Sequence, residues 1–528
     1  MIQSEQAFFT FPQDCQGYFP YVNVEGSFEQ QYHNSFESYY EKTNLSKVDS
    51  TRLIILPAYF SYKNGYKALI MESDLLHYPG MYLQKKEGNT LAAHFAPLPN
   101  VEKQGGHNML EGLVESRYPY IAKIDANESL PWRIIAVAVN DVNLADVDLV
   151  YQLATPSQIL QTDWILPGKV AWDWWNKWNI KGVPFRSGIN DETYKFYIDF
   201  ASKFGIEYII LDEGWAVNRQ ADLMQVVPEI HLDTLIQYAA KRHVRIILWA
   251  GYWAFNRDIE QICKHYAQMG IAGFKIDFMN RDDQCMVDFH RRAAQIAAKY
   301  HLLVDFHGTY KPAGIQRTYP NVINFEGVMG LEQMKWAEPT VDQVSYDVQI
   351  PFSRMACGPM DYTQGAMRNA IKQNYRPINS EPMSQGTRCH QLAEYVVFFS
   401  PLTMLCDAPT SYMANEQCAL AISQIPTVWD ETIILDGQIG EYIVTARRKG
   451  NTWYIGALNN WEERDISIDL TYLMPDRQVY TMEIFKDGIN ADKNGQDYTY
   501  QSQVLSPSSY VVHLASGGGC LMKINKQE

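Results

Sequence analysis

The chain has 528 residues, of which 46% are hydrophobic and 20% charged, and its formal net charge is −15. This balance is typical of a globular protein with a large core, and the length suggests about three domains. The negative charge argues against a nucleic-acid partner, because phosphate binding needs a basic stripe and the sequence has none. Aromatic residues reach 13%, which is compatible with sugar-stacking surfaces and equally with packed cores.

Residues 1–160 alternate short strand-like runs, such as TRLIILPAYF and RIIAVAVND, with turns. Helical periodicity is scarce there, which predicts an all-β N-terminal domain. A Pro-Gly pair near residue 165 marks the end of this region.

Over residues 161–425, apolar runs alternate with stretches of helical periodicity. The runs include IEYIILDEGW, VRIILWAGYW, GFKIDFMN, LLVDFHGTY and, less clearly, RMACGPMDY and PLTMLCDAP. Continuous apolar strands between helices indicate a parallel sheet covered on both faces. Eight such units over about 250 residues predict a (β/α)8 TIM barrel. Short β runs with hairpin-like spacing then predict a C-terminal antiparallel β-sandwich over residues 426–528.

The eight cysteines are scattered, with no CxxC pair and no metal-finger spacing, so we expect buried free thiols rather than a disulfide framework. No apolar run reaches the roughly 18 residues of a membrane span. The first residues, MIQSEQAFFTFPQD, lack the order of basic, apolar and small residues that marks a signal peptide.

Polar side chains fall at the C-terminal ends of the expected barrel strands, where the active face of such a barrel lies. They are Asp173, Asp212, Glu213, Trp249, Asp277, His307 and Glu326. Carboxylates and tryptophans without a phosphate loop favour sugar or polyol chemistry. Cleavage of a glycosidic bond needs two carboxyl groups, and the candidates are Asp277, Asp305, Glu326 and Glu332, with His307 beside them.

Lys275 and Asp277 are two residues apart in an apolar strand, so their side chains point the same way. They form either a structural ion pair or a nucleophilic aspartate that the lysine keeps ionised. Glu332 follows two glycines in NFEGVMGLEQMKW, and is either carried over the barrel mouth by a loop or solvated. Asp212 and Glu213 either position substrate hydroxyls or cap the following helix.

No local metal motif is present: there is no HExxH, no DxDxDG loop and no histidine cluster. A zinc-dependent barrel would need several histidines at strand ends, and only His307 qualifies. A calcium site made of carboxylates from distant segments leaves no local signature.

Several stretches together resemble glycoside hydrolase family 97. They are AWDWWNKWNI, LDEGW, KIDFMNRDDQ, DFHGTYKPAGIQRTYPN, NFEGVMGLE, PFSRMACGPMDYTQGA, SPLTMLCDAP and, in the first domain, MESDLLHYPGMYL. The resemblance runs from about residue 50 to the end of the chain. It implies a calcium-dependent α-glucosidase or α-galactosidase with an N-terminal β-super-sandwich, a (β/α)8 barrel and a C-terminal β-sandwich.

The resemblance also implies a mechanism. Inverting members of the family carry a glutamate base directly after the histidine of strand 5, whereas this chain has Gly308 after His307. Retaining members carry their nucleophile at the position of Asp277, and Glu332 matches the general acid. Removing a base that activates water and adding a nucleophile converts a single displacement into a double one.

The resemblance implies a calcium site in which Glu326 and Glu72 are ligands and Glu332 lies in or near the shell. Gly308 removes a further ligand that inverting members have, so the site would use fewer carboxylates and more water. We expect Lys275, Asp212, Asp173, Trp249 and His307 to contact the substrate, because they line the same rim.

The sequence therefore predicts a retaining exo-α-galactosidase that acts on terminal α-galactosides of oligosaccharides. An α-glucosidase or another retaining α-glycosidase of the family is the first alternative, and a non-catalytic carbohydrate-binding protein is the second. Family members begin with a signal sequence and a longer first domain, so we expect this chain to be truncated and the full-length protein to be periplasmic or secreted. A genuine start would make it cytoplasmic. The sequence predicts no oligomeric state.

Overall fold

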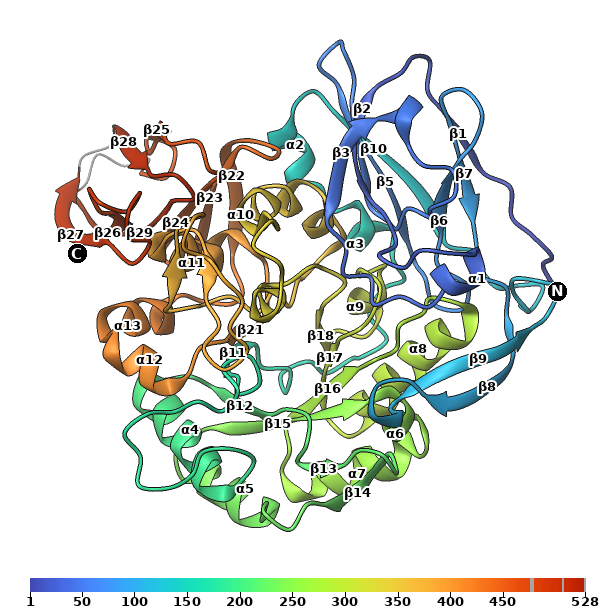
Figure 1. Cartoon of the computed structure of the whole chain (residues 1–528), viewed down its shortest axis with the longest axis horizontal. Helices are drawn as coiled ribbons and strands as arrows, with labels where there is room; N and C mark the ends of the chain where they lie inside the picture. Colours follow the sequence, from blue (N-terminus) through green and yellow to red (C-terminus); the bar gives the residue numbers. More distant parts are fainter. Residues whose placement is uncertain (475–478, 506–507, 527–528) are drawn as a thin grey trace.

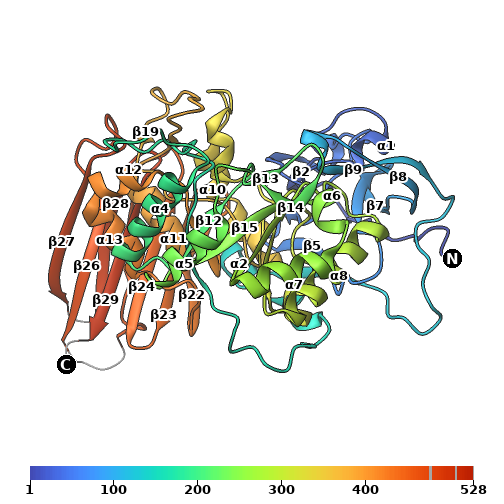
Figure 2. The ribbon, with the colours of Figure 1, turned by 90° about the horizontal axis from the view of Figure 1, so that it is seen from below.

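The computed structural model describes residues 1–474, 479–505 and 508–526. A β-rich N-terminal unit and a C-terminal β-sandwich lie at opposite ends of the molecule, with a parallel barrel between them (Figures 1 and 2). Within the described ranges, no helix combines the length and the apolar character needed to cross a bilayer.

The N-terminal unit consists of antiparallel sheets. A five-stranded sheet has the order β10-β5-β4-β2-β3, a three-stranded sheet has the order β1-β7-β6, and β8 and β9 form a separate hairpin. The strands are β1 (Phe8–Thr10), β2 (Gln16–Pro20), β3 (Tyr40–Asn44), β4 (Ala58–Ser61), β5 (Lys67–Ser73), β6 (Tyr82–Lys85), β7 (Thr90–His94), β8 (Pro99–Gly105), β9 (Glu111–Arg117) and β10 (Trp132–Ala138). Short helices interrupt them, namely α1 (Phe28–Gln31), η1 (Leu45–Lys47), η2 (His107–Met109), α2 (Asp141–Ala145) and α3 (Leu149–Leu153).

The central unit is a nearly closed barrel around a parallel sheet of seven strands, in the order β18-β17-β16-β15-β12-β11-β21. Its strands are β11 (Gly168–Ala171), β12 (Tyr208–Leu211), β15 (Arg245–Gly251), β16 (Gly273–Asp277), β17 (Leu303–Phe306), β18 (Val322–Phe325) and β21 (Leu402–Leu405). A small hairpin, β13 (Ala216–Val217) and β14 (Asp222–Val226), follows β12, and a two-stranded pair, β19 (Asn369–Ala370) and β20 (Ser384–Gln385), precedes the last helices.

Helices and short 3-10 turns surround this sheet. They are α4 (Asp191–Phe204), α5 (Leu232–Ala240), α6 (Tyr252–Asn256), α7 (Ile259–Met269), α8 (Gln284–Lys299), α9 (Ile315–Thr318), η3 (Leu331–Lys335), α10 (Gln343–Asp347), η4 (Ile350–Phe352), η5 (Arg354–Cys357), α11 (Arg388–Val397), α12 (Pro409–Ala414) and α13 (Glu416–Gln424). Local sequence sets their ends. In α4, the Asn190 side chain accepts the N–H of Thr193, and Gly205 ends the helix with a φ of 68°.

One of the eight predicted barrel units does not form a strand. The run RMACGPMDY contains η5 instead, and an extended segment after it fills the gap between β18 and β21. The N–H of Asp361 donates to the carbonyl of Phe325 at 2.7 Å, and the N–H of Met360 donates to the carbonyl of Phe399 at 2.9 Å. Two backbone hydrogen bonds thus replace a strand ladder there.

The C-terminal unit is a six-stranded sheet in the order β22-β23-β24-β29-β26-β27, with β25 and β28 forming a separate pair. The strands are β22 (Glu431–Gln438), β23 (Tyr442–Lys449), β24 (Thr452–Asn459), β25 (Arg464–Asp469), β26 (Tyr480–Asp487), β27 (Tyr498–Leu505), β28 (Ser509–Leu514) and β29 (Gly519–Lys526). Helix α11 packs against β24 and β29. Every residue of α11 is buried, because the barrel covers one side of the helix and this sheet the other.

All eight cysteines lie within the described residues. None is paired, and seven are buried, as the sequence predicts. They pack as small core residues and form no disulfide bonds.

Candidate active site

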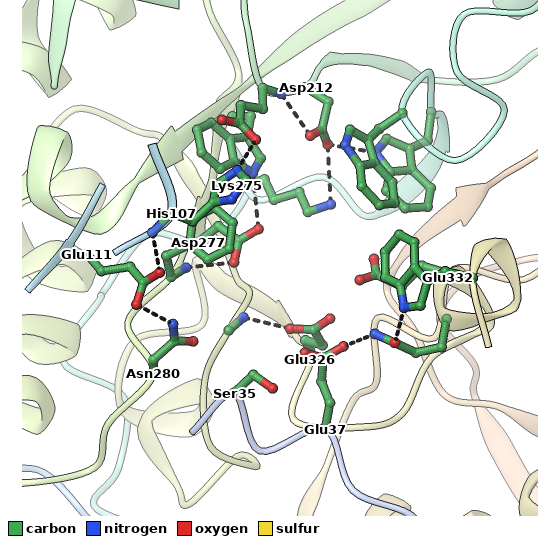
Figure 3. Close-up of a pocket in the computed structure, with 18 residues that line it drawn as sticks. Ser35, Glu37, His107, Glu111, Asp212, Lys275, Asp277, Asn280, Glu326 and Glu332 are labelled. Carbon is green, nitrogen blue, oxygen red and sulfur yellow. Dashed lines mark hydrogen bonds and ion pairs between the residues drawn. The ribbon is translucent and has the colours of Figure 1, made fainter. Parts of the chain in front are cut away.

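A cavity of about 420 Å³ lies at the carboxyl ends of the barrel strands, the edge that carries the active site in such barrels. Figure 3 shows its lining side chains. They are Ser35, Glu37, His107, Glu111, Trp172, Trp174, Asp212, Glu213, Trp249, Lys275, Asp277, Phe278, Asn280, Gly308, Glu326, Glu332, Gln333 and Trp336. The cavity is therefore rich in carboxylates and indole rings and has a single lysine in its wall.

Asp277 is the last residue of β16 and lines the cavity. Its Oδ2 accepts a hydrogen bond from Nε1 of Trp249 at 3.2 Å, and its Oδ1 accepts the N–H of Phe278 at 2.6 Å. Trp249 comes from the neighbouring strand β15. The two donors fix the orientation of the carboxylate at the strand end.

Gly308 lies directly behind Asp277. Its φ is 53°, and a Cβ built on it would be 2.9 Å from Oδ1 of Asp277 and 2.8 Å from the backbone nitrogen of Phe278. Contacts this short do not occur without displacement of a neighbour. A side chain at position 308 would therefore displace the carboxylate of Asp277 or the backbone at Phe278.

Lys275 pairs with Asp212 rather than with Asp277. Its Nζ is 3.3 Å from Oδ2 of Asp212 and 4.4 Å from the centroid of the Trp172 ring. Burial opposes the lysine charge, but the surrounding carboxylates, Asp212 foremost, together outweigh it and raise the pKa of Lys275. Strand alternation correctly places Lys275 and Asp277 in the same wall of the cavity. The ammonium group of Lys275, however, forms its ion pair with Asp212, which follows β12.

Asp173, a predicted substrate contact, does not line the cavity. Its Oδ2 accepts hydrogen bonds from the hydroxyl of Tyr194 at 2.7 Å and from Nε1 of Trp178 at 2.8 Å. Burial, followed by the charge of Asp212, raises the pKa of Asp173 to about 7. Asp173 therefore supports the segment that carries Asp212, whose N–H donates to its Oδ2 at 3.4 Å, and direct contact with substrate stays a prediction.

His307 is also behind the cavity wall, with 2% of its surface exposed. Its Nε2 is 2.6 Å from Oδ2 of Asp361, and its Nδ1 is 3.3 Å from Oε1 of Glu326. Burial opposes the imidazolium, but these two carboxylates hold the pKa of His307 well above its usual range. His307 thus contacts Glu326, and its contact with substrate stays a prediction. Asp305, a candidate carboxyl, is also outside the cavity lining.

Glu332 lies in η3 and lines the cavity. In Figure 3, Asp277 and Glu332 lie on opposite sides of the cavity. Burial, followed by the charge of Glu37, raises the pKa of Glu332 to about 8. A carboxyl group that is protonated at neutral pH suits a general acid.

Glu37 is a site residue that the sequence did not reveal. It comes from the N-terminal unit, between α1 and β3, and its Oε1 accepts a hydrogen bond from Nε2 of Gln333. Burial and the charge of Glu326 raise its pKa well above the usual range. The surrounding residues NSFES have no periodicity or motif that could have pointed to the site.

Glu72, the predicted ligand from the N-terminal unit, does not line the cavity. It lies in β5 and is paired with two cations, Arg133 Nη1 at 2.8 Å and Lys311 Nζ. The N–H of Met81 also donates to its carboxylate. Both oxygens are therefore occupied, and the N-terminal carboxylate at the cavity is Glu37 instead.

The carboxylates at the Glu326 side of the cavity fit a hard divalent cation. Single ligand atoms of His307, Glu326 and Glu332 lie within 4.8 Å of one another, and Glu37 adjoins Glu326 (Figure 3). Burial and mutual repulsion raise the pKa of all three glutamates. A cation that prefers oxygen ligands, such as Ca²⁺, would relieve this repulsion.

The β8–β9 hairpin brings two further side chains to the rim. His107 Nε2 is 3.1 Å from Oε2 of Glu213, and the His107 ring centroid is 4.8 Å from that of Phe278. Glu111 accepts the N–H of His107 at 2.6 Å and Nδ2 of Asn280 at 3.1 Å. Glu213 thus anchors the hairpin and caps no helix, because the chain after it enters β13.

Models of glycoside hydrolase family 97 match the chain in three places. The N-terminal model matches residues 1–156, the catalytic model residues 174–328, and the C-terminal model, described as an oligomerisation domain, residues 428–525. A retaining α-galactosidase of Bacteroides thetaiotaomicron is 56% identical over 527 residues, which is 99% of this chain and 79% of that protein. A probable retaining α-galactosidase of Streptomyces bingchenggensis is 30% identical over 461 residues, covering 86% of this chain and 64% of that protein.

Solved structures give the same assignment. A family 97 enzyme from Pseudoalteromonas sp. strain K8, in complex with acarbose, superposes with a TM-score of 0.83 at 26% identity, covering 99% of this chain and 80% of that one. A β-arabinopyranosidase shares the fold, with a TM-score of 0.77 at 24% identity and coverages of 98% and 79%. The chain belongs to glycoside hydrolase family 97.

Proposed function

We propose that this protein is a retaining exo-α-galactosidase that hydrolyses terminal α-galactosides by double displacement. The observation that carries the proposal is the pairing of Asp277, at the end of β16, with Gly308, whose lack of a side chain makes room for it. The 56% identity to a retaining α-galactosidase over 99% of the chain supports it.

In the first step, a carboxylate oxygen of Asp277 attacks the anomeric carbon. The bond from that carbon to the leaving oxygen breaks, and Glu332 gives its proton to this oxygen. The product is a β-galactosyl ester of Asp277. The raised pKa of Glu332, about 8, keeps the proton available at neutral pH.

In the second step, the Glu332 carboxylate removes a proton from water, and the water oxygen attacks the anomeric carbon. The ester bond to Asp277 breaks, and the α-anomer of galactose leaves. Both residues return to their starting protonation states, and the configuration is retained because it is inverted twice.

Lys275 and Asp212 offer a donor and an acceptor for neighbouring hydroxyl groups of the terminal sugar, since both line the cavity. The ion pair between Lys275 and Asp212 fixes the ammonium group in position, and so does the contact of this group with the Trp172 ring. Trp249 acts on Asp277 through its hydrogen bond and lines the same cavity.

Calcium is the second part of the proposal. Glu37 and Glu326 would hold the ion, with Glu332 beside it, and the His307–Asp361 pair would orient Glu326. When bound, the ion supplies a fixed positive charge that offsets the clustered carboxylates and attracts a sugar hydroxyl.

The decisive experiment follows the first-formed anomer by NMR with aryl α-galactoside and aryl α-glucoside in parallel. We expect faster hydrolysis of the galactoside and initial release of the α-anomer. Initial release of the β-anomer would refute retention. Faster hydrolysis of the glucoside would favour the α-glucosidase alternative, and hydrolysis of neither would favour a carbohydrate-binding protein.

A further inference from the structure

A second cluster of titratable side chains lies where the barrel meets the C-terminal sandwich. It consists of Asp347 in α10 and of His390 and Glu394, one turn apart in α11. The three side chains are buried, with 1%, 0% and 0% of their surface exposed. One ligand atom from each lies within 4.8 Å of the others. None of the three lines the active-site cavity.

The hydrogen bonding of His390 directs one ring nitrogen into this cluster. Nδ1 is 3.1 Å from the carbonyl oxygen of Gly518, and only a protonated Nδ1 can donate to a carbonyl. In the neutral ring, the lone pair on Nε2 therefore faces the two carboxylates. This arrangement, with one ring N–H donated to a backbone carbonyl, is the usual one for a metal-bound histidine.

Two buried polar atoms of these residues lack hydrogen bonds. They are Nε2 of His390 and Oε2 of Glu394, whereas Oε1 of Glu394 accepts a hydrogen bond from Gln391. Buried polar atoms are nearly always satisfied, so these two require an explanation. A bound ion is one of the explanations that fit.

The charges of the cluster are also unbalanced. Among the residues that the structure describes, no lysine or arginine forms an ion pair with Asp347 or Glu394; each pairs only with His390. If both carboxylates were ionised beside a neutral imidazole, their double charge would be uncompensated, which is costly in a medium of low dielectric constant. A divalent cation would cancel this charge.

The separations match those of a tetrahedral metal site. Nε2 of His390 is 3.3 Å from Oδ2 of Asp347 and 3.6 Å from Oε1 of Glu394. Zinc–ligand bonds of about 2.0–2.2 Å place two ligands about 3.3–3.6 Å apart at the tetrahedral angle. Both distances from Nε2 are therefore compatible with a shared ion, and the third pair of ligand atoms lies within 4.8 Å.

We propose that Asp347, His390 and Glu394 bind a structural divalent transition-metal ion, with zinc as the best chemical match. One imidazole nitrogen with two carboxylate oxygens suits zinc better than calcium, which takes more oxygen ligands at longer distances. Neighbouring groups hold the ligands: the Tyr362 hydroxyl donates to Oδ1 of Asp347, and Gln391 donates to Oε1 of Glu394.

The site would join two units of the protein. Gly518 directly precedes β29 of the C-terminal sheet, and its carbonyl holds the His390 ring. Gln343, which donates to Asp347 at 3.2 Å, also donates to the carbonyl of Met329, at the start of the loop that leads to Glu332. The ion would stabilise the junction of barrel and sandwich. This inference does not depend on the proposed galactosidase activity or on calcium.

Metal analysis of the full chain tests the inference. The protein is produced in zinc-supplemented medium, passed over a chelating resin to remove loosely held and active-site ions, and analysed by inductively coupled plasma mass spectrometry. We expect about one zinc per chain in the wild type and less than about a tenth of that in His390→Gln and Glu394→Gln. The matched control is Glu326→Gln, which alters the active-site carboxylates and should keep its zinc.

Diffraction at the zinc absorption edge supplies a test that needs no variant. An anomalous peak between the three side chains in wild-type crystals supports the site even if the variants fail to fold. A wild-type protein that holds no transition metal after zinc supplementation would overturn the inference, since the cluster would then be held by shared protons. Full zinc content in folded His390→Gln would overturn it equally.

Discussion

Asp277 occupies space that a side chain on residue 308 would need, because a Cβ built on Gly308 would lie 2.9 Å from its Oδ1. The glycine is therefore part of the environment of the proposed nucleophile, although it has no functional group. A carboxylate attached to residue 308 would displace Asp277 or the backbone at Phe278. If Asp277 is the nucleophile, as proposed, steric exclusion between these two neighbouring strand ends would help to set the choice between a double and a single displacement.

Gly308→Ala tests this relationship. We expect kcat to fall by roughly 10²-fold, the scale of loss when a reacting group is displaced by about an ångström. The matched control is Gly182→Ala, since Gly182 also has a positive φ, 71°, but a Cβ added to it would have no atom within 4 Å. Both variants carry the same backbone strain of about 1 kcal/mol, so similar unfolding temperatures with unequal kcat would support steric exclusion. Equal, near-wild-type kcat values would contradict it.

The roles of the two carboxyl residues are separated by the stereochemistry of azide products. Asp277→Ala should lower kcat by roughly 10³-fold or more, and azide should then yield the β-galactosyl azide by a single displacement. In Glu332→Ala, azide should attack the glycosyl-enzyme and yield the α-galactosyl azide. Product NMR distinguishes the two anomers, and identical anomers from both variants would refute the assignment.

The pH dependence of kcat/KM should report the proton on Glu332. As the proposed general acid, Glu332 acts in its protonated form, and its pKa is raised to about 8, so kcat/KM should fall as the pH rises through this value. Added calcium should move this limb to lower pH, because a nearby cation favours the carboxylate. A 2,4-dinitrophenyl galactoside needs no acid catalysis and serves as the control. If its profile shows the same limb, the limb belongs to another group.

Calcium dependence should distinguish Glu37 from Glu72. Chelation should reduce activity, and calcium should restore it. Glu37→Gln should raise the calcium concentration for half-maximal restoration by roughly tenfold or more. Glu72→Gln should leave this midpoint unchanged but lower the unfolding temperature, because Arg133 and Lys311 lose a shared buried partner. A shift of the calcium midpoint in Glu72→Gln, with no shift in Glu37→Gln, would instead identify Glu72 as the calcium ligand.

The order of the elements could be predicted from the sequence because barrel strands and helices differ in hydrophobic period. The strand-end carboxylates could be predicted for the same reason, since Asp277, Asp212 and Glu326 each end an apolar run. The apolar content of RMACGPMDY predicted a strand. In the structure, this segment is joined to its neighbours between β18 and β21 by two backbone hydrogen bonds, from Met360 and Asp361, and not by a strand ladder.

The pairing partners could not be predicted. Spacing along one strand places Lys275 beside Asp277, whereas the distance across the barrel to Asp212 is set by strand order and tilt. Likewise, Asp173 and His307 end strands as true rim residues do, yet they are held behind the wall by Tyr194 and Asp361. Glu37 had no signal at all, because only the docking of the N-terminal unit brings it to the cavity.

Glu37, His107 and Glu111 have an evolutionary consequence, because they reach the cavity from outside the barrel. The barrel alone is not a portable catalytic module. Exchanging residues 1–160 between relatives would transplant one side of the pocket and a candidate metal ligand, while Asp277 and Glu332 stayed with the recipient. Substitutions in the N-terminal unit can therefore change the sugar preference. We expect the N-terminal unit and the barrel to evolve together, because both line the pocket.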